Sequence, residues 1–139
     1  EGDARVSLER EPDQGFDVLA IDAFSGDSIP VHMLTREAFR VYFRHVKPGG
    51  VLAIHVSNRF LDFSPVIARL AAAFGKQPLA VHSPGDRNAH TMEATWILVT
   101  SNRALLDSPV FQANGRRLPV PRQGRLWTDD YSNLFQVMR

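Results

Sequence analysis

The sequence of 139 residues contains no cysteine. This absence excludes disulfides, thiolate metal sites and cysteine nucleophiles, and it is typical of proteins from a reducing compartment. Long hydrophobic runs are missing too, because no segment approaches the length of about 18 apolar residues that a membrane-spanning helix requires. The first residues are Glu, Gly and Asp, not a basic and then apolar leader. We therefore expect a cytoplasmic domain without direct membrane contact.

The chain also lacks an excess of charge of one sign. Sixteen Lys and Arg residues oppose fifteen Asp and Glu residues, which leaves a net charge of +1. This balance gives no electrostatic reason to bind nucleic acid, and we expect no such partner. The five histidines show no two-histidine helical spacing and no nearby carboxylate pattern, so we expect no metal. His55 and His82 lie inside apolar runs and are expected to be buried and hydrogen-bonded.

What the chain does have is enough apolar residues, 44% of the total, for one well-packed domain. Continuous apolar runs predict strands covered on both faces, and they lie at residues 16–22, 51–57, 79–83 and 94–101. Between them, amphipathic segments that begin at Thr35 and Ser64 predict helices, the first ended by Pro48, Gly49 and Gly50. The alternation predicts an α/β fold with a mostly parallel sheet and helices on both faces.

The last predicted strand is expected to run in the opposite direction. Only about ten residues separate residues 79–83 from residues 94–101, which is too short for a helical crossover. The two strands are therefore predicted to be antiparallel neighbours. By analogy at the level of the fold, a parallel sheet with a reversed final strand is typical of S-adenosylmethionine-dependent transferases.

Four stretches carry a resemblance to a known family: the Gly2-Asp3 pair, FDVLAIDAFSGDSIP, LTREAF and KPGGVLAIHVSN. In order and approximate spacing they resemble the spermidine synthase-like family of polyamine aminopropyltransferases. The resemblance covers nearly the whole chain. It implies a class I methyltransferase-like, Rossmann-like domain, and it extends to bacterial members in which this domain is the cytosolic part of a membrane-anchored parent. The family's glycine-rich cofactor loop is not in this sequence, so residues 1–139 are expected to form a single domain that is the carboxyl-terminal portion of the family's domain.

The resemblance also implies roles for particular residues. Gly2 and Asp3 would contact the adenine side of the aminopropyl donor, Asp22 would help deprotonate the attacking amine, and Asp27 would hold the polyamine cation. The residues alone support Asp22 as a site, because it follows a buried strand at the end where open α/β sheets bind ligands. A turn or cap is the alternative for Asp22 and Asp27, and fraying of the chain end is the alternative for Asp3.

The tail offers one more candidate. The adjacent acids Asp129 and Asp130, followed by the aromatic Tyr131, would close over a polyamine; the alternative is a solvated turn anchored by Trp127.

The expected activity is transfer of an aminopropyl group from decarboxylated S-adenosylmethionine to a small-molecule polyamine. One alternative is an S-adenosylmethionine-dependent methyltransferase, which a neutral crevice would favour where an acidic one favours a polyamine. Another is a catalytically silent interaction domain. In this chain the strand at residues 16–22 would have an exposed apolar edge, which predicts a homodimer or higher homo-oligomer.

Overall fold

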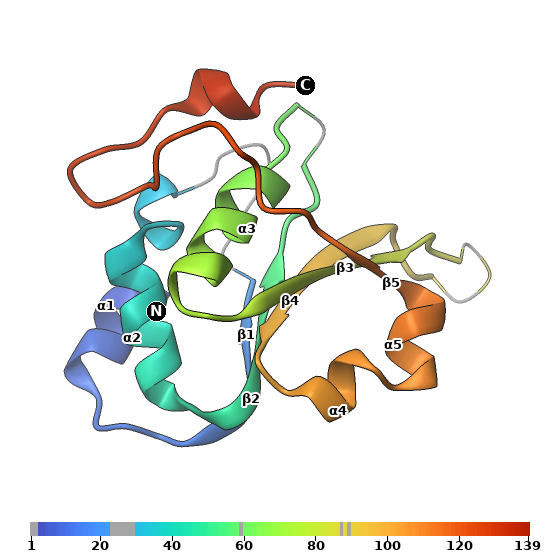
Figure 1. Ribbon diagram of the computed structural model, residues 1–139. Helices are drawn as coiled ribbons and strands as arrows, with labels where there is room; N and C mark the ends of the chain where they lie inside the picture. Colours follow the sequence, from blue (N-terminus) through green and yellow to red (C-terminus); the bar gives the residue numbers. More distant parts are fainter. Residues whose placement is uncertain (1–2, 23–29, 59, 87, 89) are drawn as a thin grey trace.

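A five-stranded sheet flanked by helices makes up the computed structural model (Figure 1), which describes residues 3–22, 30–58, 60–86, 88 and 90–139. The strands are β1 (Phe16–Ile21), β2 (Val46–His55), β3 (Gln77–Ser83), β4 (Ala94–Thr100) and β5 (Gly115–Arg117). The helices are α1 (Ala4–Arg10), α2 (Arg36–His45), α3 (Ser64–Ala73), α4 (Arg103–Leu106) and α5 (Pro109–Asn114), with the 3-10 turns η1 (Val31–Met33) and η2 (Leu134–Val137).

The strand order is β1-β2-β4-β3-β5, so the reversed strand β4 lies between β2 and β3. The predicted antiparallel pairing of β3 with β4 is confirmed, with Leu79 opposite Leu98. The expectation of a mostly parallel sheet is confirmed only in part. β1, β2 and β3 run in the same direction, but β1 with β2 is the one parallel pair among the described strands. The reason is that β4 returns beside β3 and uses its second edge to pair with β2.

The sequence predicted that the glycine pair Gly49-Gly50 ends the helix, and this is wrong. Helix α2 ends at His45, and the glycines belong to a longer strand β2. The register between β1 and β2 shifts, so that Phe16 pairs with Val46 while Val18 pairs with Val51. Gly49 has a φ of +78°, and a Cβ on Gly50 would lie 2.9 Å from the Asp17 carbonyl oxygen of β1. Glycine therefore lets the chain bend here and still approach β1 closely.

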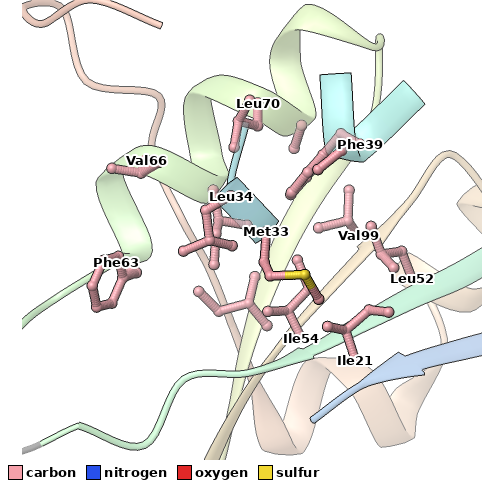
Figure 2. Packing of buried hydrophobic residues seen from close by; sticks show 14 of the residues in the cluster. Ile21, Met33, Leu34, Phe39, Leu52, Ile54, Phe63, Val66, Leu70 and Val99 are labelled. Atoms are coloured by element: carbon pink, nitrogen blue, oxygen red, sulfur yellow. The ribbon is translucent and has the colours of Figure 1, made fainter. Parts of the chain in front are cut away.

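The main core lies between the sheet and helices α2 and α3. Because side chains alternate along a strand, every second residue of β2 and β4 faces these helices. Leu52, Ile54 and Val99 are fully buried there, and Figure 2 shows them opposite Phe39 and Leu70. Burying each such side chain contributes roughly 1.5–3 kcal/mol, so this layer holds the strands in place.

The other face of the sheet is covered over part of its area. Val51 and Leu98 border the same small apolar space as Leu105 of α4 and Phe111 of α5, and Figure 1 shows these two helices on the side away from α3. β1 lies at one edge of the sheet, as predicted, and Val18 on it is exposed. Helices thus flank both faces, while the far face of β1 stays open.

The tail packs back on the body through Trp127, as the sequence predicted. Its indole is buried edge-on against Phe63, with ring centroids 6.2 Å apart, and its carbonyl accepts a hydrogen bond from the Arg36 N–H at 2.9 Å. The red segment in Figure 1 accordingly crosses over α3. In the part of the chain that the structure describes, none of the helices has the length and apolarity needed to cross a bilayer.

Candidate active site

Asp22 lies where the sequence predicted it, directly after the carboxyl end of β1. Its preceding residue Ile21 pairs with Ile54 of β2, and because these strands are parallel, both carboxyl ends meet at one edge of the sheet. Ile21 and Ile54 face the core. Their successors Asp22 and His55 therefore lie on the opposite face, side by side.

Three side chains form a connected cluster at this edge. His55 Nδ1 lies 2.8 Å from Asp22 Oδ1, and His55 Nε2 lies 2.6 Å from Ser57 Oγ. We call Asp22, His55 and Ser57 the rim cluster. Ser57 Oγ also accepts a hydrogen bond from the Thr95 N–H at 2.9 Å, which ties the cluster to β4.

The carboxylate of the rim cluster is open to solvent and its histidine is not. The Asp22 side chain is 58% exposed, whereas that of His55 is 21% exposed. His55 stacks on Trp96, its cross-strand partner, with ring centroids 5.0 Å apart. Of the two Asp22 carboxylate oxygens, only Oδ1 has a hydrogen-bond partner among the described residues, and that partner is His55. The carboxylate can therefore contact a solute while His55 holds it.

A cavity of about 500 Å³ adjoins the rim cluster at Ser57. Asn58, Glu93, Thr95 and Arg139 also border it. Its volume falls in the range of small-molecule sites. Among the described residues that border it, Glu93 is acidic and Arg139 is basic, so this part of the lining is close to neutral in charge. Asn58 has a local role as well, since its Oδ1 accepts hydrogen bonds from the N–H groups of Phe60 and Leu61 at 2.9 and 2.8 Å.

The predicted donor-binding residue Asp3 is the N-cap of α1. Its carboxylate accepts a hydrogen bond from the Val6 N–H at 3.1 Å and also contacts His32 Nε2. The hydrogen bond to His32 holds the pKa of Asp3 below its usual range. Asp3 thus has a structural task, and its contact with an adenine stays a prediction. Gly2 and the predicted polyamine ligand Asp27 lie outside the described residues.

Asp129, the first of the two adjacent tail acids that the sequence suggests as polyamine contacts, binds the body of the domain instead. Arg5 binds it through both guanidinium ends, with Nη1 2.7 Å from Oδ1 and Nη2 2.6 Å from Oδ2. Thr35 Oγ1 donates to the same Oδ1 at 2.7 Å and accepts from the Ala38 N–H as the cap of α2. We call Arg5, Thr35 and Asp129 the tail clasp. The Arg5 guanidinium holds the pKa of Asp129 below its usual range.

Asp130 and Tyr131, the predicted polyamine contacts, lie in a turn beside the clasp. Thr128 and Tyr131 close this turn with two backbone hydrogen bonds of 2.9 and 3.1 Å. Asp130 is exposed, and the guanidinium of Arg125 lies 4.3 Å from the centre of the Tyr131 ring. The structure therefore shows the anchored turn, and a role in binding stays a prediction for both residues.

His55 is the site residue that sequence reasoning missed. It was expected to be buried and hydrogen-bonded, without a link to Asp22. The signal was present, because Asp22 and His55 each follow the last isoleucine of a predicted parallel strand. Aligning the two strand ends would have placed the side chains together. Within residues 3–22, 30–58, 60–86, 88 and 90–139, there is no group of three or more potential ligands that could hold a metal ion.

The chain is similar in sequence or in structure to known proteins. A polyamine aminopropyltransferase from Vibrio vulnificus (strain CMCP6) is 31% identical over 77 residues, which are 54% of this chain and 26% of that protein. The crystal structure of a probable spermidine synthase from Corynebacterium glutamicum ATCC 13032 has a TM-score of 0.56 and 17% sequence identity.

The sequence match is to a polyamine aminopropyltransferase, and the structural match shows a fold shared with a probable spermidine synthase. The structural match covers 89% of this chain and 53% of the Corynebacterium protein, so it establishes a shared fold over about half of that protein. The chain spans about a quarter of the Vibrio relative. The five-stranded α/β sheet is consistent with a methyltransferase-like fold. No model of a protein family matches the chain.

Proposed function

We propose that this spermidine synthase-like chain forms the acceptor-activating part of an aminopropyltransferase, which moves an aminopropyl group from decarboxylated S-adenosylmethionine to a polyamine. The observation that carries this proposal is the exposed carboxylate of Asp22 at the carboxyl edge of parallel strands β1 and β2. Ligands of open α/β sheets bind at this edge.

The chemistry needs one base and a positioned nucleophile. A neutral amine of the polyamine attacks the propyl carbon that is bonded to the sulfonium, a C–N bond forms, and the C–S bond breaks. The electron pair of that bond stays on sulfur, which leaves as the neutral thioether methylthioadenosine. The new ammonium then gives its extra proton to Asp22. A carboxylate with an exposed side chain, such as Asp22, is suited to accept that proton.

Other contacts follow the family resemblance. Asp27, Asp130 and Tyr131 are proposed to hold the polyamine, and Gly2 and Asp3 to contact the donor. For Tyr131 this requires Arg125 to leave the ring face that it now covers or the polyamine to use the other face. No metal is needed, because the leaving thioether is neutral. We propose that the rest of the donor site, including a glycine-rich loop, comes from outside the described residues.

The test is product analysis with matched acid variants. This chain, and any longer protein that contains it, is incubated with a polyamine and either decarboxylated S-adenosylmethionine or S-adenosylmethionine, and methylthioadenosine is measured by chromatography. Asp22→Asn should lower kcat by about 10²- to 10⁴-fold. Asp17→Asn is the control, since Asp17 lies on the same strand at its far end, exposed and paired with Lys47 at 3.0 Å.

A methyltransferase is the second candidate, because one observation favours it: the described residues that border the cavity beside Ser57 include one acid and one base, so this lining is not acidic. Release of S-adenosylhomocysteine in place of methylthioadenosine would select this candidate. If neither donor binds by calorimetry and neither product forms, the alternative of an interaction domain gains support.

We also propose that the chain forms a homodimer or higher homo-oligomer through β1. The outer edge of β1 pairs with no other described strand, and the side chains of Phe16 and Val18 are exposed there. An unpaired apolar edge promotes pairing between copies. Light scattering at micromolar concentration should show a dimer that Val18→Lys converts to a monomer; a monomeric wild-type chain would contradict this.

A further inference from the structure

We propose that His55 is a positioning residue that orients the Asp22 carboxylate, and that Ser57 and Trp96 hold His55 in the orientation this requires. This inference rests on the proposed function, in which Asp22 accepts the proton of the attacking amine. It begins from the two ring nitrogens of His55, which lie 2.8 Å from Asp22 Oδ1 and 2.6 Å from Ser57 Oγ.

The hydrogen-bond directions assign one tautomer to a neutral His55. An ionised carboxylate is an acceptor only, so Nδ1 must carry the hydrogen that points at Asp22. Nε2 then accepts, and the hydroxyl hydrogen of Ser57 supplies the bond. The Ser57 oxygen accepts from the Thr95 N–H at the same time, since a hydroxyl can donate one hydrogen bond and still accept others. Each donor in the chain from Thr95 to Asp22 thus meets one acceptor.

The plane of the His55 ring is held by packing in addition to the hydrogen bonds. His55 and Trp96 are cross-strand partners on β2 and β4, and their rings stack at an interplanar angle of 27°. The Ser57 hydroxyl meets the ring from the other nitrogen. A base must lie within hydrogen-bond reach of its proton, and small misplacements reduce rates strongly. Asp22 is exposed and follows the end of its strand, and its hydrogen bond to His55 fixes the direction of the carboxylate.

Serine hydrolases have the same hydrogen-bonded sequence of side chains, Asp to His to Ser. The contacts of Ser57 nevertheless favour a role in which it orients His55. In the triad, an attacking serine oxygen needs donors placed to stabilise the oxyanion that forms. Here the backbone N–H of Thr95 donates to the serine oxygen itself, and so is not directed at a substrate oxygen. Ser57 is therefore assigned to hold His55, and covalent labelling of Ser57 by a fluorophosphonate would overturn this assignment.

Two amide substitutions separate the two nitrogens of His55. Asn places its amide N–H near the position of Nδ1 and preserves the bond to Asp22, whereas Gln places its amide near Nε2 and preserves only the bond to Ser57. In aminopropyl transfer, His55→Gln should lower kcat by about 10- to 100-fold with KM unchanged. His55→Asn should restore most of kcat. His82→Gln is the control, since His82 is an exposed strand histidine bonded to Thr95 Oγ1 at 3.2 Å.

The outcomes distinguish this inference from the proposed function. If Asp22→Asn keeps full activity, the proposed function fails. If Asp22→Asn is inactive while His55→Gln keeps full kcat, only the positioning role of His55 is wrong. Equal losses in the Asn and Gln variants would also overturn it, since the Nδ1 donor would then not be the feature that matters.

A second measurement does not depend on activity. Nitrogen-15 NMR of the histidine side chains, recorded at alkaline pH on this chain, reports which ring nitrogen carries the hydrogen. We expect His55 with its hydrogen on Nδ1, and a mixture of tautomers in Ser57→Ala. A hydrogen on Nε2 in the wild-type chain would overturn the assignment.

Discussion

The rim cluster and the tail clasp both centre on an aspartate, but they use it in opposite ways. In the clasp, both oxygens of Asp129 bind Arg5, and Oδ1 also accepts from Thr35. At the rim, Asp22 Oδ1 meets a histidine and the side chain is 58% exposed. A carboxylate held by a permanent cation and a hydroxyl stabilises structure. Asp22 accepts from one ring nitrogen and has much of its side chain exposed, so a solute can reach it.

The difference in partner burial supports this division of roles. The Arg5 side chain is only 12% exposed, so the cation of the clasp is shielded and cannot exchange Asp129 for water at low cost. The clasp joins α1, α2 and the tail, which are far apart in the sequence. The rim cluster joins adjacent strand ends. Loss of the clasp should therefore affect folding, and loss of the rim cluster should affect activity.

The largest expected effect on stability is at the anchor of the clasp-bearing tail. Trp127→Ala should lower the free energy of unfolding by about 3–5 kcal/mol, because it leaves a cavity against Phe63. Urea unfolding measures this. Phe135→Ala, in the same tail but exposed, is the control and should change stability by less than about 0.5 kcal/mol. Equal losses in the two variants would mean that the tail is not anchored at Trp127.

The next largest effect on stability is expected from substitution of Arg5 in the tail clasp. Arg5→Met should lower the free energy of unfolding by about 1–2 kcal/mol, less than a fully buried pair because the Asp129 side chain is 41% exposed. Arg10→Met changes the same helix at an exposed position and serves as the control. If the two variants unfold at the same urea concentration, the clasp does not hold the tail.

Acid should expose the clasp in the wild-type chain. The pKa of Asp129 is lower in the folded protein than its ordinary value of 3.8, first because Arg5 binds the ionised form. A lowered folded-state pKa contributes stability that is present above the unfolded value and lost as pH falls through the folded one. Unfolding measured from about pH 5 down to about pH 2 should therefore show a smaller loss in Arg5→Met than in the wild-type chain. Parallel curves would contradict the assignment.

The smallest effect separates two adjacent acids in the tail. Asp130 is exposed and has no side-chain partner among the described residues. Asp130→Asn should change stability by less than about 0.5 kcal/mol, where Asp129→Asn should lower it measurably. If Asp130 holds the polyamine, its variant should raise KM a few-fold with kcat unchanged. If Asp130→Asn lowered stability as much as Asp129→Asn, this would contradict the conclusion that only Asp129 of the two stabilises the fold.

Much of the fold could be predicted from local patterns. The strands at Phe16 and Ala94, the cap at Thr35 and the antiparallel return of β4 were all predicted and are confirmed. The predicted end of α2 was wrong, because Gly49 and Gly50 belong to strand β2 and do not end the helix. The short strand β5 was not predicted, since its pairing with β3 comes from a distant segment in an irregular loop. His82, expected to be buried, is exposed.

By itself, the sequence determined strands β1 to β4 in outline, the helix cap at Thr35 and the place of Asp22 at a strand end, because apolar period and turn chemistry are local properties. Only the tertiary structure decided which neighbour each carboxylate has: His55 for Asp22 and Arg5 for Asp129. These contacts join residues 33 and 124 positions apart. They depend on strand register and on the path of the tail, which no local pattern specifies.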